Sequence, residues 1–257
     1  MTSPGQANSR WMTLAIVVAC LAAAAVFFLL GRQGAGPVDD DYIVYRYARH
    51  WLEDGRLVYN LAGPGSTPID SEGYTSPLWL VCCVVAEAMA IMPERFSPAL
   101  GLLGWLVATV SSGLAVGALG EGEERGGARF FAGVTAALMV AFSPAAAWHS
   151  HAGLGTLPLA GAVGGALWAA SKRQTSVFAL ASAAAVLLRL ESLAVLVPLA
   201  LLFRRGAEEN GAARGSAAAW IAAFVPFAAA LVVVGVRNWA FGRWLPATFH
   251  VKTLPLA

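Results

Sequence analysis

Residues 11–31 form an uncharged apolar run close to the start of the chain. A helix needs roughly 20 such residues to cross the hydrocarbon core of a bilayer. The apolar part of a secretory signal peptide is shorter, about 7 to 15 residues, and further apolar runs follow this one. We therefore predict a retained first membrane span over residues 11–31. Arg10 precedes it, which favours a cytoplasmic tail over residues 1–10.

The composition supports a membrane protein, because 58% of the residues are hydrophobic and only 12% are charged. The formal net charge is +2, and no basic tract with interleaved aromatic residues is present. These features exclude the class of nucleic-acid-binding proteins. The spacing of Cys20, Cys82 and Cys83 matches neither a disulfide framework nor a metal site. These cysteines are expected to be small apolar core residues.

Further apolar runs cover residues 78–92, 99–119, 130–147, 157–170, 176–203 and 216–236. An unsatisfied backbone group in hydrocarbon is costly and no long alternating strands are present, so the predicted fold is an all-α, polytopic transmembrane bundle of about seven or eight helices. Arg189 and Glu191 interrupt the fifth of these runs. Simple alternation from the first span does not place every loop on a consistent side. One run in the middle is therefore expected to be short, re-entrant or not a span.

Residues 42–53, which follow the first span closely, have the pattern of an amphipathic helix. Apolar and aromatic residues recur at helical spacing, while charged residues and a histidine occupy the other positions. The predicted apolar face consists of Tyr42, Tyr45, Ala48, Trp51 and Leu52, and the predicted polar face consists of Arg46, Arg49, His50 and Glu53. We predict a helix that lies along the membrane interface and ends at Gly55.

Three consecutive carboxylates, Asp39, Asp40 and Asp41, precede this helix. One reading is helix capping, because an acidic residue favours a helix N-terminus. Capping requires only one of them, and three clustered carboxylates repel one another. A second role, as a general base or as ligands of a cation, is the alternative reading.

Four short motifs follow one another over about forty residues, and their order and spacing resemble those of a known family. The motifs are Asp39-Asp40-x-Tyr42-Ile43, Arg46-Tyr47-Ala48, Leu57-Val58-Tyr59-Asn60 and Glu72-Gly73-Tyr74-Thr75-Ser76-Pro77-Leu78-Trp79. They resemble the first outer loop of the polytopic glycosyltransferases of the C superfamily (GT-C). The likeness is greatest to the bacterial group that includes terminal arabinofuranosyltransferases of cell-envelope polysaccharides.

Three later stretches extend the resemblance from about Val38 to the end of the chain. Residues 148–159 resemble a segment with Ser-Gly-Leu-Glu-Thr, but Gly155 stands where the acidic residue is expected. Residues 187–192 resemble a Thr-Arg-Pro-Glu turn and keep Arg189 and Glu191. Residues 245–253 resemble a Leu-Pro-Asn-Thr stretch that is followed by a lysine, here Lys252.

The resemblance implies transfer of a sugar, a hexose or a pentose, from a polyprenyl-phosphate donor to a glycan or lipid acceptor of the cell envelope. It implies a multi-pass protein of the bacterial plasma membrane whose active side faces the periplasm or exterior. The acidic pair of the family corresponds to Asp39 and Asp40, and Asp41 occupies a variable position. Asp39 is expected to act as the base. Asp40 would orient it, bind sugar hydroxyls or hold a divalent cation, and the anomeric carbon would be inverted.

Six other polar residues are candidates for substrate binding, each with a structural alternative. They are Arg46, Glu72, Tyr74, Arg189, Glu191 and Lys252. Arg46 and Lys252 could instead meet lipid headgroups at the interface. Glu72 and Tyr74 could cap and anchor a helix that re-enters the membrane, and Arg189 and Glu191 could form a structural ion pair.

The expected organisation has an outer catalytic loop at 32–77, further spans at 78–236 and an outer interfacial tail at 237–257. Members of the resembled family continue well beyond the lysine-containing stretch, so the chain is expected to be the N-terminal part of a longer architecture. The alternative function is a non-catalytic transport or assembly subunit on a GT-C-like scaffold. The pair Asp39 and Asp40 separates these alternatives, since a scaffold has no need of it.

Overall fold

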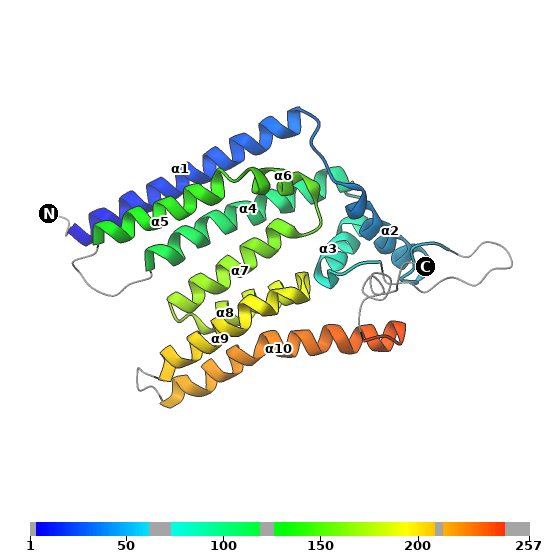
Figure 1. Cartoon of the computed structure of the whole chain (residues 1–257). Helices are drawn as coiled ribbons and strands as arrows, with labels where there is room; N and C mark the ends of the chain where they lie inside the picture. Colours follow the sequence, from blue (N-terminus) through cyan, green and yellow to red (C-terminus); the bar gives the residue numbers. More distant parts are fainter. Residues whose placement is uncertain (1–3, 62–72, 119–125, 209–212, 245–257) are drawn as a thin grey trace, which may run out of the picture.

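The computed structural model describes residues 4–61, 73–118, 126–208 and 213–244. These residues form an all-helical protein and contain no strand (Figure 1). The all-α prediction is therefore confirmed.

Three helices are long and apolar enough to cross a membrane: α1 (Pro4–Arg32), α4 (Pro93–Ala118) and α10 (Ala213–Phe241). The pair α5 (Gly126–Ala141) and α6 (Pro144–Ala152), bent by 48° at the break between them, could form a fourth span. This marks the chain as a membrane protein, and the predicted first span at 11–31 lies within α1. By length and composition, the described residues contain three helices, or up to four with the bent pair counted as one, that could each cross a membrane, fewer than the seven or eight expected.

The difference lies in the four shorter apolar helices: α3 (Pro77–Ala88), α7 (Thr156–Ser171), α8 (Thr175–Leu188) and α9 (Leu193–Glu208). The longest of them have 16 residues, which at 1.5 Å per residue gives about 24 Å, less than the ~30 Å hydrocarbon core. The run 176–203 is split into α8, a short 3-10 helix (Leu190–Ser192) and α9, at the interruption predicted from Arg189 and Glu191.

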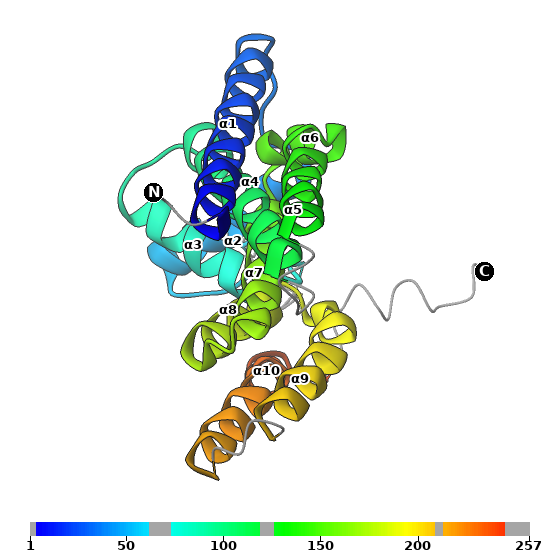
Figure 2. The same cartoon turned by 90° about the vertical axis from the view of Figure 1, so that its left-hand side faces the viewer.

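The helices alternate in direction along the bundle (Figures 1 and 2). The helices α1, α5, α8 and α10 run one way, and α4, α7 and α9 return. The short helix α3 begins and ends at the same end of the bundle, beside α2 (Asp39–Asp54). The run 78–92 therefore does not pass along the bundle.

Small residues let α4 pack closely against α6 and α7. The most extensive packing of α4 is with α7, followed by α5. A Cβ atom at Gly104 would lie 2.3 Å from the backbone nitrogen of Pro158, and one at Gly101 would lie 2.0 Å from the carbonyl oxygen of Ser150. Any larger residue would push the backbones apart. Close backbone approach of this kind is how membrane helices gain packing energy where lipid removes the hydrophobic driving force.

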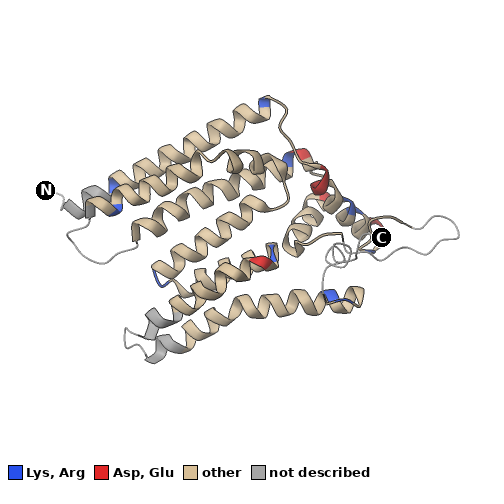
Figure 3. Ribbon diagram, in the orientation of Figure 1, with Lys and Arg blue, Asp and Glu red and all other residues tan. Residues whose placement is uncertain are grey.

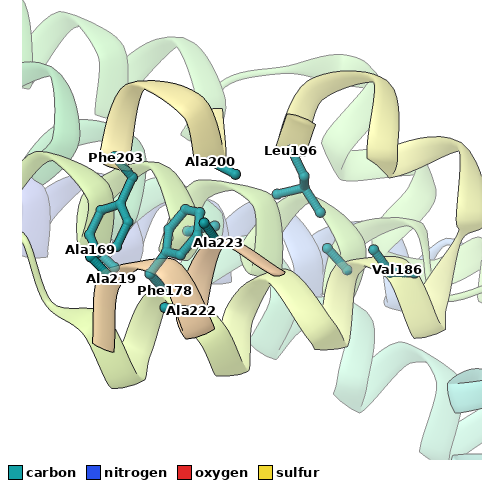
Figure 4. Packing of buried hydrophobic residues seen from close by; sticks show 11 residues of the cluster. Ala169, Phe178, Val186, Leu196, Ala200, Phe203, Ala219, Ala222 and Ala223 are labelled. Carbon is teal, nitrogen blue, oxygen red and sulfur yellow. The ribbon is translucent and has the colours of Figure 1, made fainter. Parts of the chain in front are cut away.

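A cluster of buried hydrophobic side chains joins α7, α8, α9 and α10 (Figure 4). The rings of Phe178 and Phe203 stack at its centre with a centroid distance of 4.5 Å. Alanines surround them, among them Ala169, Ala219 and Ala222. The small side chains allow the four helices to close around the two rings.

Helix α2 crosses the end of the bundle, which is the end where α3 also lies (Figure 1). Its predicted stop is confirmed, because Gly55 has φ +67° and its N–H donates to the carbonyl of Trp51 at 3.1 Å. Of the predicted apolar face, Tyr45 and Ala48 are buried within the protein, whereas Tyr42, Trp51 and Leu52 are exposed on its surface. The buried residues are Asp41, Val44, Tyr45, Tyr47 and Ala48. The contact face is rotated because α3 packs against this side of α2 and Asp41 finds polar partners within the interior.

Candidate functional site

The three acidic residues occupy the first turn of α2 and differ sharply in exposure. Asp39 and Asp40 are exposed, whereas Asp41 is fully buried at 0%. The N-cap is Val38 and no side chain caps the helix, so the capping reading does not hold in its simple form. The carboxylates still lie where the helix dipole favours negative charge. The N–H of Val38 donates to the carbonyl of Ala152 at 3.1 Å, which ties the start of α2 to α6.

Asp41 anchors this turn through three hydrogen bonds from different parts of the chain. Its Oδ1 accepts from the indole N–H of Trp79 at 2.8 Å and from the backbone N–H of Leu154 at 3.1 Å. Its Oδ2 accepts from the hydroxyl of Ser97. All three donors are neutral, and the N-terminal end of α2 also favours a carboxylate at this position. The bonds join α2 to α3, to α4 and to the turn between α6 and α7.

That turn is shaped to approach Asp41 closely. Gly153, Leu154 and Gly155 have φ angles of +80°, +64° and +68°. A Cβ atom at Gly153 would lie 2.3 Å from Oδ2 of Asp41, so no larger side chain fits there. At Gly155, where the resemblance leads us to expect an acidic residue, a Cβ atom would meet the Trp79 ring at 3.2 Å. The carboxylate beside this turn comes instead from Asp41.

A polar cleft of 720 Å³ opens beside the first turn of α2. The end of α1, the connection over residues 33–38, the start of α4 and α6 enclose it, and its walls include Gln33, Val38, Tyr42, Glu94, Trp148 and His151. The Tyr42 hydroxyl donates to Oε1 of Glu94 at 2.6 Å. This hydrogen bond to the carboxylate raises the pKa of Tyr42 to about 12, so the phenol stays protonated at neutral pH. Val38 and Tyr42 line the cleft, and Asp39 and Asp40 lie between them in sequence without lining it themselves.

An apolar groove of 560 Å³ lies between α3, α4, α7 and α8. Aliphatic side chains, glycines and the ring of Trp79 line it, for example Leu78, Leu100, Val107, Pro158 and Leu188. Trp79 also donates to Asp41. The first turn of α2 therefore borders the polar cleft directly and reaches the apolar groove through the indole of Trp79.

Among the predicted substrate-binding residues, Arg46 and Tyr74 are held in aromatic contacts. The Arg46 guanidinium lies 4.7 Å from the ring centroid of Tyr59, a cation–π contact. Tyr74 is 8% exposed and packs edge-on against Tyr47 and Phe241. It also lines a smaller cavity of 180 Å³ together with the buried Arg237. Sequence analysis missed Arg237 because it follows directly on the last apolar run.

Arg189 and Glu191 lie at the break between α8 and α9. Glu191 is exposed and Arg189 is half-buried. In the described part of the chain no ion pair joins them, and the one ion pair found there is Arg49 with Glu87 at 2.6 Å, between α2 and α3. Neither residue lines the three cavities above. Glu72 and Lys252 lie outside the described residues.

The described residues contain no group of three or more His, Cys, Asp or Glu side chains placed to bind a metal ion. Asp39 and Asp40 are consecutive in a helix, so their side chains leave the axis about 100° apart. The two carboxylates do not by themselves fit a divalent-cation site.

Charge is distributed unevenly along the bundle (Figure 3). Among the described residues, Asp and Glu gather at the α2 end, whereas Lys and Arg occur at both ends.

Comparison with protein-family models, curated proteins and solved structures found no match. Chemically, the α2 end offers two solvent-accessible carboxylates on a rigid turn, a polar cleft on one side and an apolar groove nearby. An exposed carboxylate can accept a proton from a hydroxyl that is held beside it.

Proposed function

We propose that this protein is a membrane glycosyltransferase of the GT-C type. It transfers a sugar from a polyprenyl-phosphate donor to a glycan or lipid acceptor on the outer side of the bacterial plasma membrane. The observation that carries the proposal is the placement of Asp39 and Asp40: both are exposed on a turn that Asp41 fixes from within. The motif resemblance supplies the substrate class.

The reaction requires few protein groups. The acceptor hydroxyl attacks the anomeric carbon, its proton passes to the carboxylate of Asp39, and the bond from that carbon to the phosphate oxygen breaks. Asp40 orients the base or binds sugar hydroxyls. The phosphate leaves as a stable anion, so no second acid is needed, and attack opposite the leaving group inverts the anomeric carbon. Arg46 and Arg189 remain candidates for contact with the phosphate, together with the buried Arg237.

The apolar groove supports a lipid-linked substrate, because its chemistry suits a hydrocarbon chain. Gly165 lines this groove, and a Cβ atom there would meet only the Cβ of Ala181, at 3.7 Å. Gly165→Leu should therefore fill the groove without displacing the backbone. We expect the KM for a polyprenyl-phosphate sugar to rise about tenfold, corresponding to ~1.4 kcal/mol of lost binding, in a membrane transfer assay.

Gly235→Leu is the matched control for this substitution. Gly235 is exposed on α10, and a Cβ atom there would meet nothing within 4 Å. Its KM should stay at the wild-type value. Equal KM values for both variants would show that the groove does not hold the lipid chain of the donor.

The proposed orientation places the α2 end outside and the turn between α7 and α8, with its Lys172 and Arg173, in the cytoplasm. In a variant whose native cysteines are replaced by alanine, we expect Asp54→Cys to react with an impermeant thiol reagent in intact cells. Gln174→Cys should react only after the membrane is permeabilised. Both positions are exposed. The reverse labelling pattern would overturn the orientation and, with it, transfer on the outer side.

A further inference from the structure

The polar cleft beside α2 has the size of a small-ligand site. At 720 Å³ it falls within the roughly 300 to 1,000 Å³ of typical ligand pockets, which is enough for one or two sugar rings. Its walls come from three stretches that are far apart in sequence, residues 30–42, the start of α4 and α6, and small residues of the connection after α1 form one side. Cβ atoms at Gly34 and Gly36 would meet nothing within 4 Å, so this side is open.

Tyr42 and Glu94 give the cleft paired hydrogen-bonding groups. The Tyr42 hydroxyl donates to Glu94 at 2.6 Å, and both side chains are exposed on the cleft wall. A carboxylate has about four acceptor positions, and a phenol that donates to it still accepts. Adjacent hydroxyls of a sugar both donate and accept, so they match this pair. Gln33 adds an amide with both functions.

Trp148 gives the cleft an aromatic surface. It is 62% exposed although it lines the cleft, so much of the indole surface is open to a ligand. An indole with a free face binds an apolar ring face without losing a native contact. Trp239 differs: it is 86% exposed on α10 and lines none of the cavities described here, as expected for an interfacial belt residue.

We infer that this cleft binds a sugar ring, with Trp148 stacking against the ring face and the Tyr42–Glu94 pair binding its hydroxyls. Asp39 and Asp40 lie in the same first turn of α2 as Tyr42, which lines the cleft. The assignment of this sugar to the transfer reaction rests on the proposed function. The binding site itself rests on the cleft. The same chemistry suits the acceptor glycan and the sugar of the donor.

The test is direct binding to the intact protein in nanodiscs, measured by saturation-transfer NMR with methyl furanosides and methyl pyranosides. We expect binding with a Kd in the millimolar range. Trp148→Ala and Glu94→Gln should each weaken it about tenfold or more. Trp239→Ala is the matched control and should not change it. If Trp148→Ala does not reach the membrane, Glu94→Gln and Tyr42→Phe carry the test.

The outcomes separate the sources of the sugar. Competition by a polyprenyl-phosphate sugar would assign the cleft to the donor, and its absence would assign the cleft to the acceptor. No binding of any glycoside to the wild-type protein, or equal binding by the wild type and the cleft variants, would overturn the inference. Glycoside binding without transfer would leave the cleft intact and remove the proposed function. Transfer that is unaffected by the cleft variants would leave the proposed function in place and show that the cleft does not bind the transferred sugar or its acceptor.

Discussion

Asp39→Asn and Asp40→Asn are each expected to reduce sugar transfer by at least about a hundredfold, the effect of removing a general base or its partner. The amide is nearly isosteric with the carboxylate but does not accept the proton of the attacking hydroxyl. Both side chains are exposed, so the fold does not depend on their contacts. The amount of protein in the membrane should therefore stay at the wild-type level. The measurement is transfer from a radiolabelled polyprenyl-phosphate sugar in membranes that hold the intact polypeptide.

The control for this experiment is Asp54→Asn, which changes an exposed carboxylate at the other end of the same helix. It should transfer sugar at the wild-type rate. Loss of the favourable helix-dipole interaction at Asp39 or Asp40 costs only about 0.3 to 1 kcal/mol, too little to explain a hundredfold loss. Mild and equal effects at all three acidic residues of the first turn would indicate a helix-dipole role. That result would favour the non-catalytic transport or assembly subunit.

Asp41→Leu is expected to destabilise the protein severely. It leaves three donors, on Trp79, Ser97 and Leu154, without their acceptor in the interior. Each buried polar group without a partner costs about 1 to 3 kcal/mol, and a typical domain has only ~5 to 15 kcal/mol in total. We expect a strong drop in the amount of folded protein and in its thermal unfolding temperature, measured in detergent. The first turn of α2 should lose its fixed position.

Two related variants make this prediction specific. In Asp41→Asn the amide oxygen accepts from Trp79 and Leu154, which bond the same oxygen of Asp41, and the amide nitrogen donates to the Ser97 hydroxyl. We expect much milder losses of stability and of transfer than for Asp41→Leu. Asp40→Leu, at an exposed position, should unfold close to the wild-type temperature. An Asp41→Leu protein as stable as Asp40→Leu would show that the buried hydrogen bonds do not hold the turn.

Sequence alone determined the features that depend on local pattern. The length of the run at 11–31 predicted the first span, and the helical spacing after Asp39 with Gly55 behind it predicted α2 and its end. The charged pair at 189 and 191 predicted the break in the fifth run. Each of these follows from residues within one continuous stretch of the chain, because hydrophobic length, helical period and helix-breaking residues are properties of the local sequence.

Only the tertiary structure decided which acidic residue is buried, which face of α2 is covered and which residues form the cleft. Asp41 looked like the least important carboxylate, yet it is the one held inside, partly by Leu154, 113 positions away. The Tyr42–Glu94 pair joins residues 52 positions apart, and Trp148 comes from a third helix. No local pattern contains these contacts. They arise because α3, α4 and the α6–α7 turn converge on one end of the bundle, where their polar donors meet a carboxylate that lipid would not solvate.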